Sequence, residues 1–358
     1  MARATVKRTA RAKGRARAKT RRAPAAVKPR RPLAIDWHTH IFLPEVVEFN
    51  RDHLVVNNFR PPTPPEQMNR TGFTRGGMSW DPDPKARLKK MDEMRVDIQV
   101  LSASLVHQCT YWAPAHDALR MDKMSNDAIA EMCSYAPHRF VGIASVPLQA
   151  PDLAARELDR AVNQLGLRGA NIASYVNDEE IGEARFWPFW AKAEELDVPV
   201  YIHPAGIRGE RFQKYLLWNS VGQTIEETMA MFSLIHEGVM DAFPNLKVVM
   251  AHGGGFLPYY AGRVDRNTEA ERRPRLGAKL SEVVSAYFKR FWYDTCMYDP
   301  FTLRSLAARV GPSRLVMGSD YPVGDLDPVG FVWKERALSE TAKVGILGKN
   351  AARLMKIG

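Results

Sequence analysis

The sequence predicts an α/β protein, a (β/α)8 or TIM barrel, on three observations. After Pro32, short apolar runs alternate with longer amphipathic stretches, a pattern that indicates parallel strands joined by helical crossovers. Eight such runs follow one another along the chain. Polar residues stand at the C-terminal ends of several widely separated runs. A barrel brings all its strand ends to one face, whereas a doubly wound open sheet with eight strands does not.

The individual runs are too short and too rich in β-branched residues to be helices. The predicted strands are Leu33–His38, Ile98–Ser102, Phe140–Val146, Leu167–Ile172, Val198–His203, Leu246–His252, Phe291–Thr295 and Leu315–Ser319. The predicted helices are Lys85–Arg95, Ala115–Tyr135, Asp152–Leu165, Glu183–Leu196, Thr224–Met240, Leu280–Phe288, Phe301–Val310 and Asn350–Met355. Residues 41–84 form a long insertion after strand 1, rich in Pro and Gly, which we expect to act as a lid or pocket wall.

The formal net charge of +11 comes from one terminal segment. Residues 1–31 contain 13 of the 51 Lys and Arg and none of the 40 acids, so residues 32–358 hold 38 basic and 40 acidic residues, a net of −2. We predict that 1–31 is a disordered basic tail, because it has too few apolar residues to offset its ordering entropy. Residues 32–358 should form the barrel. The tail could bind nucleic acid weakly, but the near-neutral body predicts no specific nucleic-acid partner.

Cysteine usage and hydropathy predict the compartment. The three cysteines are scattered and form neither a disulfide framework nor a metal motif, which fits a reducing compartment, so we predict a cytoplasmic protein. No stretch approaches the roughly 18 apolar residues that span a bilayer, so we expect no membrane association.

The first chemical motif is Asp36-Trp37-His38-Thr39-His40 at the end of the first predicted strand. Side chains alternate between the faces of a strand, so Asp36, His38 and His40 should share one face, with Trp37 and Thr39 on the other. Two imidazoles at a strand end could share one metal. An isolated His-x-His is about equally often a pair of histidines that only hydrogen-bond.

Three further strand ends carry matching groups. His203 ends the fifth run and Asp320 follows the eighth, while His252 ends the sixth and precedes three glycines that would let backbone approach a ligand. Imidazole and carboxylate are the ligands of catalytic zinc, iron and manganese. We therefore predict a divalent metal site, with zinc as the first choice and manganese or iron as alternatives. The expected ligands are His38, His40, His203 and Asp320.

With His252 the predicted site has five groups, which is more than a mononuclear metal site normally needs. We expect it to act as an acid or base beside the metal, because the pKa of an imidazole lies near neutrality.

Together these motifs resemble the amidohydrolase-related decarboxylases of the amidohydrolase superfamily. The likeness runs from about Ile35 to Asp327 and extends to Pro147-Leu148-Gln149-Ala150-Pro151, His252-Gly253-Gly254-Gly255 and Gly318-Ser319-Asp320-Tyr321-Pro322. The resemblance implies that His38, His40, His203 and Asp320 hold zinc or a similar divalent ion. It also implies that His252 activates water or steers protons.

The resemblance further implies substrate-binding arginines. Arg263, eleven residues after His252, matches an arginine that crosses a homodimer interface to bind a substrate carboxylate. A planar guanidinium suits that role because it binds carboxylate bidentately. In the insertion, Arg70 and Arg75 are further candidates, although neither falls at a clean spacing. Ala205 stands where the family has a Trp directly after His-Pro, so the pocket wall should differ.

From these observations we expect a metal-dependent non-oxidative decarboxylase of an aromatic or muconate-type carboxylic acid. His252 and Asp320 are the expected proton carriers, and Arg263 the expected anchor of the substrate carboxylate. One alternative stays open, because the same ligands could activate water. The protein would then be a metal-dependent hydrolase or hydratase acting on an amide, lactone, ester or dienoate.

Overall fold

The computed structural model describes residues 31–50, 74–75, 78–79, 83–207, 209–269 and 280–357. Arg70 and almost all of the predicted basic tail lie outside these ranges. Residues Pro32–Gly358 form a compact unit by themselves.

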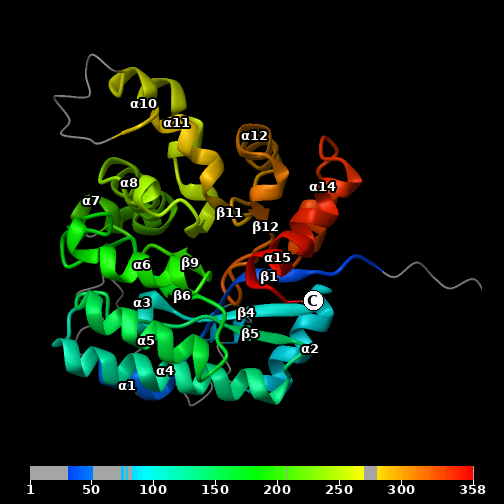
Figure 1. Cartoon of the computed structure of the whole chain (residues 1–358). Coiled ribbons are helices and arrows are strands. Elements are labelled where there is room, and N and C mark those ends of the chain that lie inside the picture. The colour runs from blue at the N-terminus through cyan, green and yellow to red at the C-terminus, as the bar shows by residue number, and fades with distance from the viewer. Residues whose placement is uncertain are drawn as a thin grey trace, which may run out of the picture. The chain divides into compact units, whose positions relative to one another are not determined.

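Eight parallel strands confirm the eight predicted runs and carry the barrel (Figure 1). They are β1 (Ile35–Ile41), β4 (Ile98–Ala103), β5 (Phe140–Gly142), β6 (Ala170–Ile172), β9 (Pro199–Ile202), β10 (Lys247–Met250), β11 (Trp292–Asp294) and β12 (Leu315–Val316). The order is β1-β4-β5 in one sheet and β12-β11-β10-β9-β6 in the other. The ladder is not continuous, and single parallel bridges, Thr39–Tyr321 and Ala144–Ala170, join the two sheets at both seams.

Helices follow the strands along the chain and lie outside them (Figure 1). Those that confirm predicted helices are α2 (Pro84–Met94), α4 (Ala115–Tyr135), α5 (Pro151–Asn163), α6 (Trp187–Glu195), α12 (Pro300–Val310) and α15 (Asn350–Met355). Several start at an Asp-Pro pair. The side chains of Asp83 and Asp299 accept hydrogen bonds from the backbone N–H groups of Lys85 and Thr302, respectively. Proline suits the first helical position because it has no N–H group, and an N–H group there would have no partner within the helix.

Two predicted helices have the wrong extent. The helix predicted over Thr224–Met240 is interrupted at Gly238, whose φ of +80° is left-handed, and divides into α8 (Thr224–His236) and α9 (Val239–Ala242). Of Leu280–Phe288, only α11 (Val284–Tyr287) is α-helical. The hydroxyl of Tyr287 lies 2.9 Å from the hydroxyl of Ser281 and also accepts a hydrogen bond from the backbone N–H of Ser281. These contacts hold the residues before α11 in a bent, non-helical conformation.

The sequence patterns gave no signal for several shorter elements. They are α1 (Pro44–Asn50), α3 (Leu105–Gln108), α7 (Glu210–Gln213), α10 (Ala261–Asn267), α13 (Pro328–Lys334), α14 (Glu340–Val344), the hairpins β2 (Thr74–Arg75)–β3 (Met78–Ser79) and β7 (Tyr175–Val176)–β8 (Glu179–Glu180), and π-helical turns at Trp218–Gln223 and Gly345–Lys349. Helix α1 and the hairpin β2–β3 belong to the insertion after β1, whose role as a lid stays a prediction.

The core has an outer and an inner part. The outer cluster packs helices against strands, with members such as Leu158 on α5 and Leu234 on α8. The inner cluster joins strand residues, among them Ile35, Trp37 and Val249, to Leu354 of the last helix, α15. Because Ile35 begins β1, this apolar cluster fills the N-terminal end of the barrel interior.

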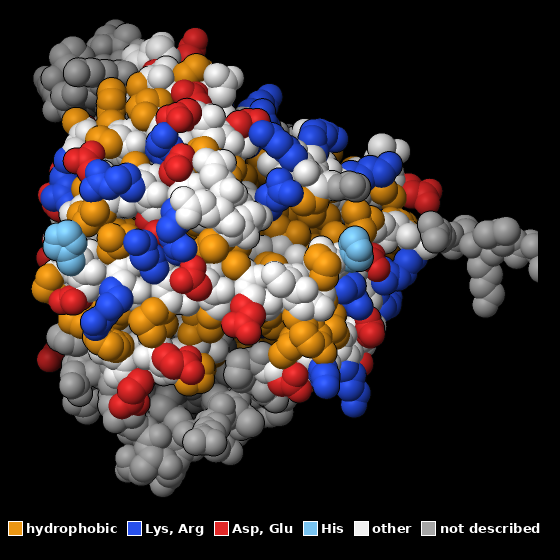
Figure 2. Space-filling model, turned by 60° about the horizontal axis from the view of Figure 1, so that its bottom comes forward, with side chains coloured by type: hydrophobic (Ala, Val, Ile, Leu, Met, Phe, Trp, Pro, Cys, Tyr) orange, Lys and Arg blue, Asp and Glu red, His pale blue; other side chains and the backbone are white. Residues whose placement is uncertain are grey.

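The surface fits the near-neutral charge of residues 32–358. Figure 2 shows one face on which Lys and Arg side chains are interspersed with Asp and Glu rather than gathered by sign. Within the described part of the chain, no helix combines the length and apolar character needed to cross a membrane.

Candidate metal centre

Four predicted ligands meet at the C-terminal ends of the strands. His38 and His40 lie on β1, His203 directly follows β9, and Asp320 follows β12. One ligand atom of each lies within 4.8 Å of those of the others. The Nε2 atoms of His38 and His40 are 3.1 Å apart, and each is 3.2 Å from Oδ1 of Asp320. Three imidazoles and one carboxylate converging on one point can hold a catalytic divalent metal.

Three of the four donors, His40, His203 and Asp320, have the protonation states that a metal requires. The pKa of His38 shifts the other way: burial lowers it, but the neighbouring Cys296, Asp320 and Asp294 outweigh burial and raise it well above its usual value. Burial lowers the pKa of His203 well below its usual value, helped by the neighbouring His40 and His38, so this imidazole is neutral. Burial alone would raise the pKa of Asp320, but His38 and His40 hold it well below its ordinary value, so this carboxylate is ionised. Neutral imidazole and ionised carboxylate are the forms that bind metal ions.

An unpartnered nitrogen supports the same interpretation. Nδ1 of His203 is buried and has no hydrogen-bond partner among the described residues. A buried polar atom without a partner costs about 1–3 kcal/mol, so such atoms usually have a reason. The residues present therefore fit a divalent ion at this position.

Asp294 orients His38 from behind. Nδ1 of His38 lies 2.7 Å from Oδ2 of Asp294, which also accepts the hydroxyl of Tyr201 at 2.9 Å. The backbone N–H of Cys296 donates to the other oxygen of Asp294 at 3.0 Å. A carboxylate behind a ligand histidine fixes the tautomer and directs Nε2 at the metal. We did not single out Asp294 from the sequence, although it lies at the end of a predicted strand, which was the signal used for the other ligands.

Ser102 orients His40 in a similar way. The hydroxyl of Ser102 donates to the carbonyl of Thr39 at 2.9 Å and lies 3.3 Å from Nδ1 of His40. Because its proton is already used, the serine oxygen accepts from Nδ1–H. Nε2 of His40 is then free to face Asp320.

The predicted alternation along β1 is wrong at its start. The pairing of β1 with β4 shifts register between Asp36 and Thr39, which breaks the period of two. Asp36 does not join the ligands. Its carboxylate accepts hydrogen bonds from the backbone N–H and hydroxyl of Ser319, at 2.9 and 2.6 Å. Trp37 instead packs edge-on against Tyr201 in the inner cluster, with ring centroids 6.3 Å apart.

The role of Asp36 is to hold the Asp320 turn in place. Its bonds to Ser319 fix the residue before Asp320, and the backbone N–H of Asp320 donates to the carbonyl of His38 at 2.9 Å. A carboxylate from the eighth strand is thereby held beside the two histidines of the first.

His252 lies beside the four ligands and outside the group that converges most closely. Its Nε2 is 4.0 Å from Oδ2 of Asp320, and its Nδ1 is 2.5 Å from Oε1 of Glu227 on α8. Burial lowers the pKa of His252, but Glu227 outweighs that effect and raises it. Burial raises the pKa of Glu227 to about 7, against the opposing effect of His252. We did not predict Glu227, because a glutamate inside a helical pattern carries no strand-end signal.

Two of the three glycines after His252 allow close contacts within the protein. A β-carbon on Gly254 would lie 2.7 Å from the ring of Tyr293, and one on Gly255 would lie 2.1 Å from the backbone oxygen of Thr224. Both glycines have left-handed φ values, +78° and +64°. Close approach within the protein accounts for glycine at these two positions, and the approach of this backbone to a ligand stays a prediction.

Of the predicted substrate-binding arginines, Arg263 has a described side chain, and that side chain lies outside this cluster. Arg263 is exposed on α10, and no hydrogen bond joins its side chain to the four ligands. Arg75 belongs to β2, and the position of its side chain lies outside the described part of the chain, as does Arg70.

A tryptophan from elsewhere in the chain packs against the residue that follows Ala205. A β-carbon on Gly206, which has φ +102°, would lie 2.9 Å from the ring of Trp218 in the π-helical turn. A tryptophan therefore packs on the segment after His203, although residue 205 itself is alanine.

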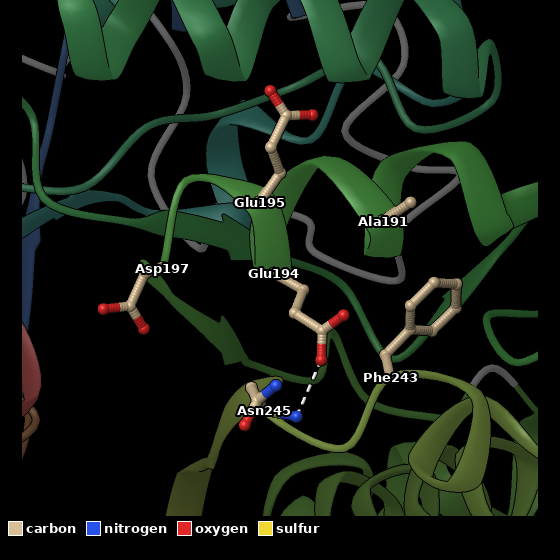
Figure 3. A pocket seen from close by; sticks show the side chains of 6 residues that line it. All are labelled: Ala191, Glu194, Glu195, Asp197, Phe243 and Asn245. Carbon is tan, nitrogen blue, oxygen red and sulfur yellow. Dashed lines mark hydrogen bonds between the residues drawn. The ribbon is translucent and has the colours of Figure 1, made fainter.

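A separate hollow lies away from this centre (Figure 3). It is lined by residues at the end of α6 and before β10, and it includes the acids Glu194, Glu195 and Asp197. One oxygen of Glu194 accepts the backbone N–H of Asn245 at 2.7 Å. The hollow precedes β9 and β10, whereas the ligand His203 follows β9, and it includes none of the predicted site residues.

Comparison with known proteins agrees with this arrangement. The sequence model of the family described as Amidohydrolase matches residues 35–357. The chain belongs to the amidohydrolase family. The chain is 36% identical over 280 residues to a 2-amino-3-carboxymuconate-6-semialdehyde decarboxylase of Dictyostelium discoideum, an alignment that covers 77% of each chain. The family resemblance seen in the motifs is thus confirmed.

Solved structures show the same fold. A 5-carboxyvanillate decarboxylase from Sphingomonas paucimobilis superposes on this protein with a TM-score of 0.80 at 27% identity, over 91% of this chain and 99% of that one. A dihydroxybenzoic acid decarboxylase from Polaromonas, with bound manganese and the inhibitor 2-nitroresorcinol, gives a TM-score of 0.75 at 26% identity, over 91% and 97%. The predicted barrel fold is confirmed.

Proposed function

We propose that this protein is a metal-dependent carbon–carbon lyase, a non-oxidative decarboxylase of an aromatic or muconate-type carboxylic acid. The observation that carries the proposal is the convergence of His38, His40, His203 and Asp320 on one point with His252 beside them. The decarboxylases to which the chain is similar support the reaction class.

We propose that the four ligands hold one divalent ion. Their nitrogen and oxygen donors suit zinc, manganese or iron. Zinc remains our first choice, and the manganese of the Polaromonas enzyme makes manganese the main alternative. When bound, the ion supplies Lewis-acid chemistry that polarises an oxygen.

The chain's own residues would manage the proton. Decarboxylation breaks the bond between the carboxylate carbon and the ring or diene carbon. The carboxylate leaves as CO₂, and the ring or diene carbon keeps the electron pair and takes a proton. Nε2 of His252 lies 4.0 Å from Oδ2 of Asp320, which supports the proposal that these two groups carry this proton between them. An imidazole is an effective general acid near neutral pH.

Substrate binding would involve a second copy of the chain. We propose a homodimer in which Arg263 of one protomer anchors the substrate carboxylate in its partner's site. Arg263 is exposed on α10, and segments after β9 and β10 expose large apolar side chains, Tyr215 at 87% and Tyr260 at 62%. Exposed aromatic side chains are typical of protein interfaces. Arg70 and Arg75 of the insertion are the candidates for a second anchor.

Subunit mixing tests the shared site. Arg263→Ala and His252→Ala should each be inactive while keeping their metal. A heterodimer of the two contains one site that lacks both groups and one site with both intact, so activity should reappear on exchange. Confirmed exchange without activity, or an active wild-type monomer, would contradict the proposal.

A substrate panel tests the reaction itself. The metal-loaded protein is supplied with aromatic and muconate-type acids while CO₂ is measured, and with amides, lactones, esters and dienoates while addition of water is measured. We expect CO₂ from at least one acid. Water addition without CO₂ release would instead establish the hydrolase or hydratase alternative. We further propose a cytoplasmic location, which suits the three free cysteines.

A further inference from the structure

Helix α8 places two adjacent buried glutamates against two functional segments. Glu226 accepts hydrogen bonds from the hydroxyl of Ser174 at 2.9 Å and from the backbone N–H groups of Ala205 and Gly206, each at 3.1 Å. It therefore holds the segment that follows the ligand His203. Glu227 reaches the other way and contacts His252.

The contact between Glu227 and His252 is short and largely shielded from solvent. Oε1 of Glu227 lies 2.5 Å from Nδ1 of His252, the glutamate side chain is fully buried, and the imidazole is 12% exposed. The second oxygen, Oε2, is also buried and has no hydrogen-bond partner among the described residues. The imidazole is thus the main partner of a carboxylate that has lost its water, and such charge-assisted bonds are among the strongest in proteins.

The turn that carries His252 needs an external support. His252 has a left-handed φ of +44° and is followed by three glycines, so the local backbone does little to fix the ring. Helix α8 supplies the support. The backbone oxygen of Thr224 abuts Gly255, and the hydroxyl of Thr228 accepts the backbone N–H of Phe256 at 2.8 Å. Thr224 and Thr228 flank the glutamate on the helix, so the same turn of α8 brings Glu227 to the imidazole.

We propose that Glu227 is the positioning residue of His252, receiving Nδ1–H so that Nε2 is directed at Asp320. This inference rests on the proposed function, in which His252 handles the proton. With Nδ1–H committed to the carboxylate, only Nε2 can exchange a proton with the reacting carbon or with Asp320. If the tautomer flipped, Nε2 would carry the proton at the wrong stage and the ring could rotate out of line. A carboxylate behind a catalytic imidazole has this role in other enzymes.

Two substitutions and a control test the proposal. Glu227→Gln keeps the size of the side chain but can offer an amide donor to Nδ1, and Glu227→Asp keeps the charge but draws it back by one carbon. Glu237→Gln changes an exposed glutamate just after α8. We expect Glu227→Gln to lower kcat by about 10–100-fold. KM should stay within about twofold and the metal content should be unchanged, because neither binding nor ligation uses Glu227. Glu227→Asp should fall between, and Glu237→Gln should match the wild type.

A second readout does not depend on activity. The ring N–H proton of a short histidine–carboxylate bond resonates far downfield in the proton NMR spectrum. The His38–Asp294 pair, whose atoms are 2.7 Å apart, should give a second such signal. We expect both signals in the wild type and in Glu237→Gln, and the loss of one of them in both Glu227→Gln and His252→Ala. If Glu227→Gln fails to fold, the comparison is made with Glu227→Asp, whose signal should move upfield as kcat falls.

Three results would overturn the inference: a Glu227 variant that folds with wild-type kcat, a Glu227→Gln variant that loses none of the downfield signals, or loss of metal from that variant. A wild type that releases no CO₂ from any acid would defeat the proposed function instead. The NMR signal would still report whether the pair exists, so the two failures can be told apart.

Discussion

The two ends of the barrel interior are built from the same strands and have opposite chemistry. At the N-terminal end, Ile35, Trp37 and Val249 pack with Leu354 of α15 in an apolar cluster. At the C-terminal end, one residue beyond Trp37, the interior turns to histidine and carboxylate. Burial stabilises the first end by about 25 cal/mol per Å² of apolar surface. At the second end burial costs free energy unless a ligand compensates. The comparison indicates that one end supplies stability and the other is maintained for chemistry.

The largest expected effect is on turnover at the polar end. His252→Ala should keep its metal and lower kcat by about 10²–10⁴-fold, the usual contribution of a positioned general acid or base. Steady-state kinetics and elemental analysis of the same preparation measure both. Loss of the metal from this variant would show that His252 is itself a ligand and does not have a role separate from the four predicted ligands.

The matching change at the apolar end should affect stability alone. Leu354 is 4% exposed. Leu354→Ala should lower the free energy of unfolding by about 2–5 kcal/mol, because it leaves a cavity in the inner cluster. Denaturant unfolding measures this, while kcat below the melting transition should match the wild type. A large fall in kcat without loss of stability would mean that the two ends are not separable.

A smaller effect is expected on the stability of the metal-free protein, which reports the free-energy cost of burying the polar end. In protein stripped of metal by a chelator, His203→Leu removes a buried nitrogen that has no partner among the described residues. We expect the stripped variant to be as stable as the stripped wild type or up to about 1–2 kcal/mol more stable. Thermal unfolding of the two apoproteins gives the answer. A clear loss of stability would show that His203 contributes to folding without a metal.

The smallest effect concerns the terminal segment, which carries 13 basic residues and no acidic residue. Removing residues 1–31 should leave the melting temperature and kcat essentially unchanged. A folding or activity defect in the truncated protein would contradict the prediction that this segment is dispensable.

Much of this arrangement could be predicted because a barrel converts distant strand ends into neighbours. His38, His203 and Asp320 are far apart in the sequence, yet each comes at or just after the end of an apolar run, and that position is enough to bring them together. The same rule would have found Asp294. The end of the helix near Gly238 could also have been predicted, since glycine commonly ends helices.

Other features depend on packing that no local pattern records. The register shift in β1 arises from its pairing with β4, so the alternation of Asp36 and Trp37 could not be derived from β1 alone. Glu227 becomes a partner of His252 only because glycines let α8 approach the turn, which places residues 25 positions apart in contact. Such contacts between a helix and a loop have no sequence period.

The central claim is that the polar end is a metal centre, and metal stoichiometry tests it most directly. Chelator-stripped wild type is titrated with Zn²⁺ and, separately, with Mn²⁺, and the bound metal is measured after removal of the excess. The same titration is made with His38→Ala and His203→Ala. We predict about one ion per chain for the wild type and almost none for either variant, since each removes one of four converging ligands. Wild-type protein that retains no ion, or variants that retain a full equivalent, would contradict the account.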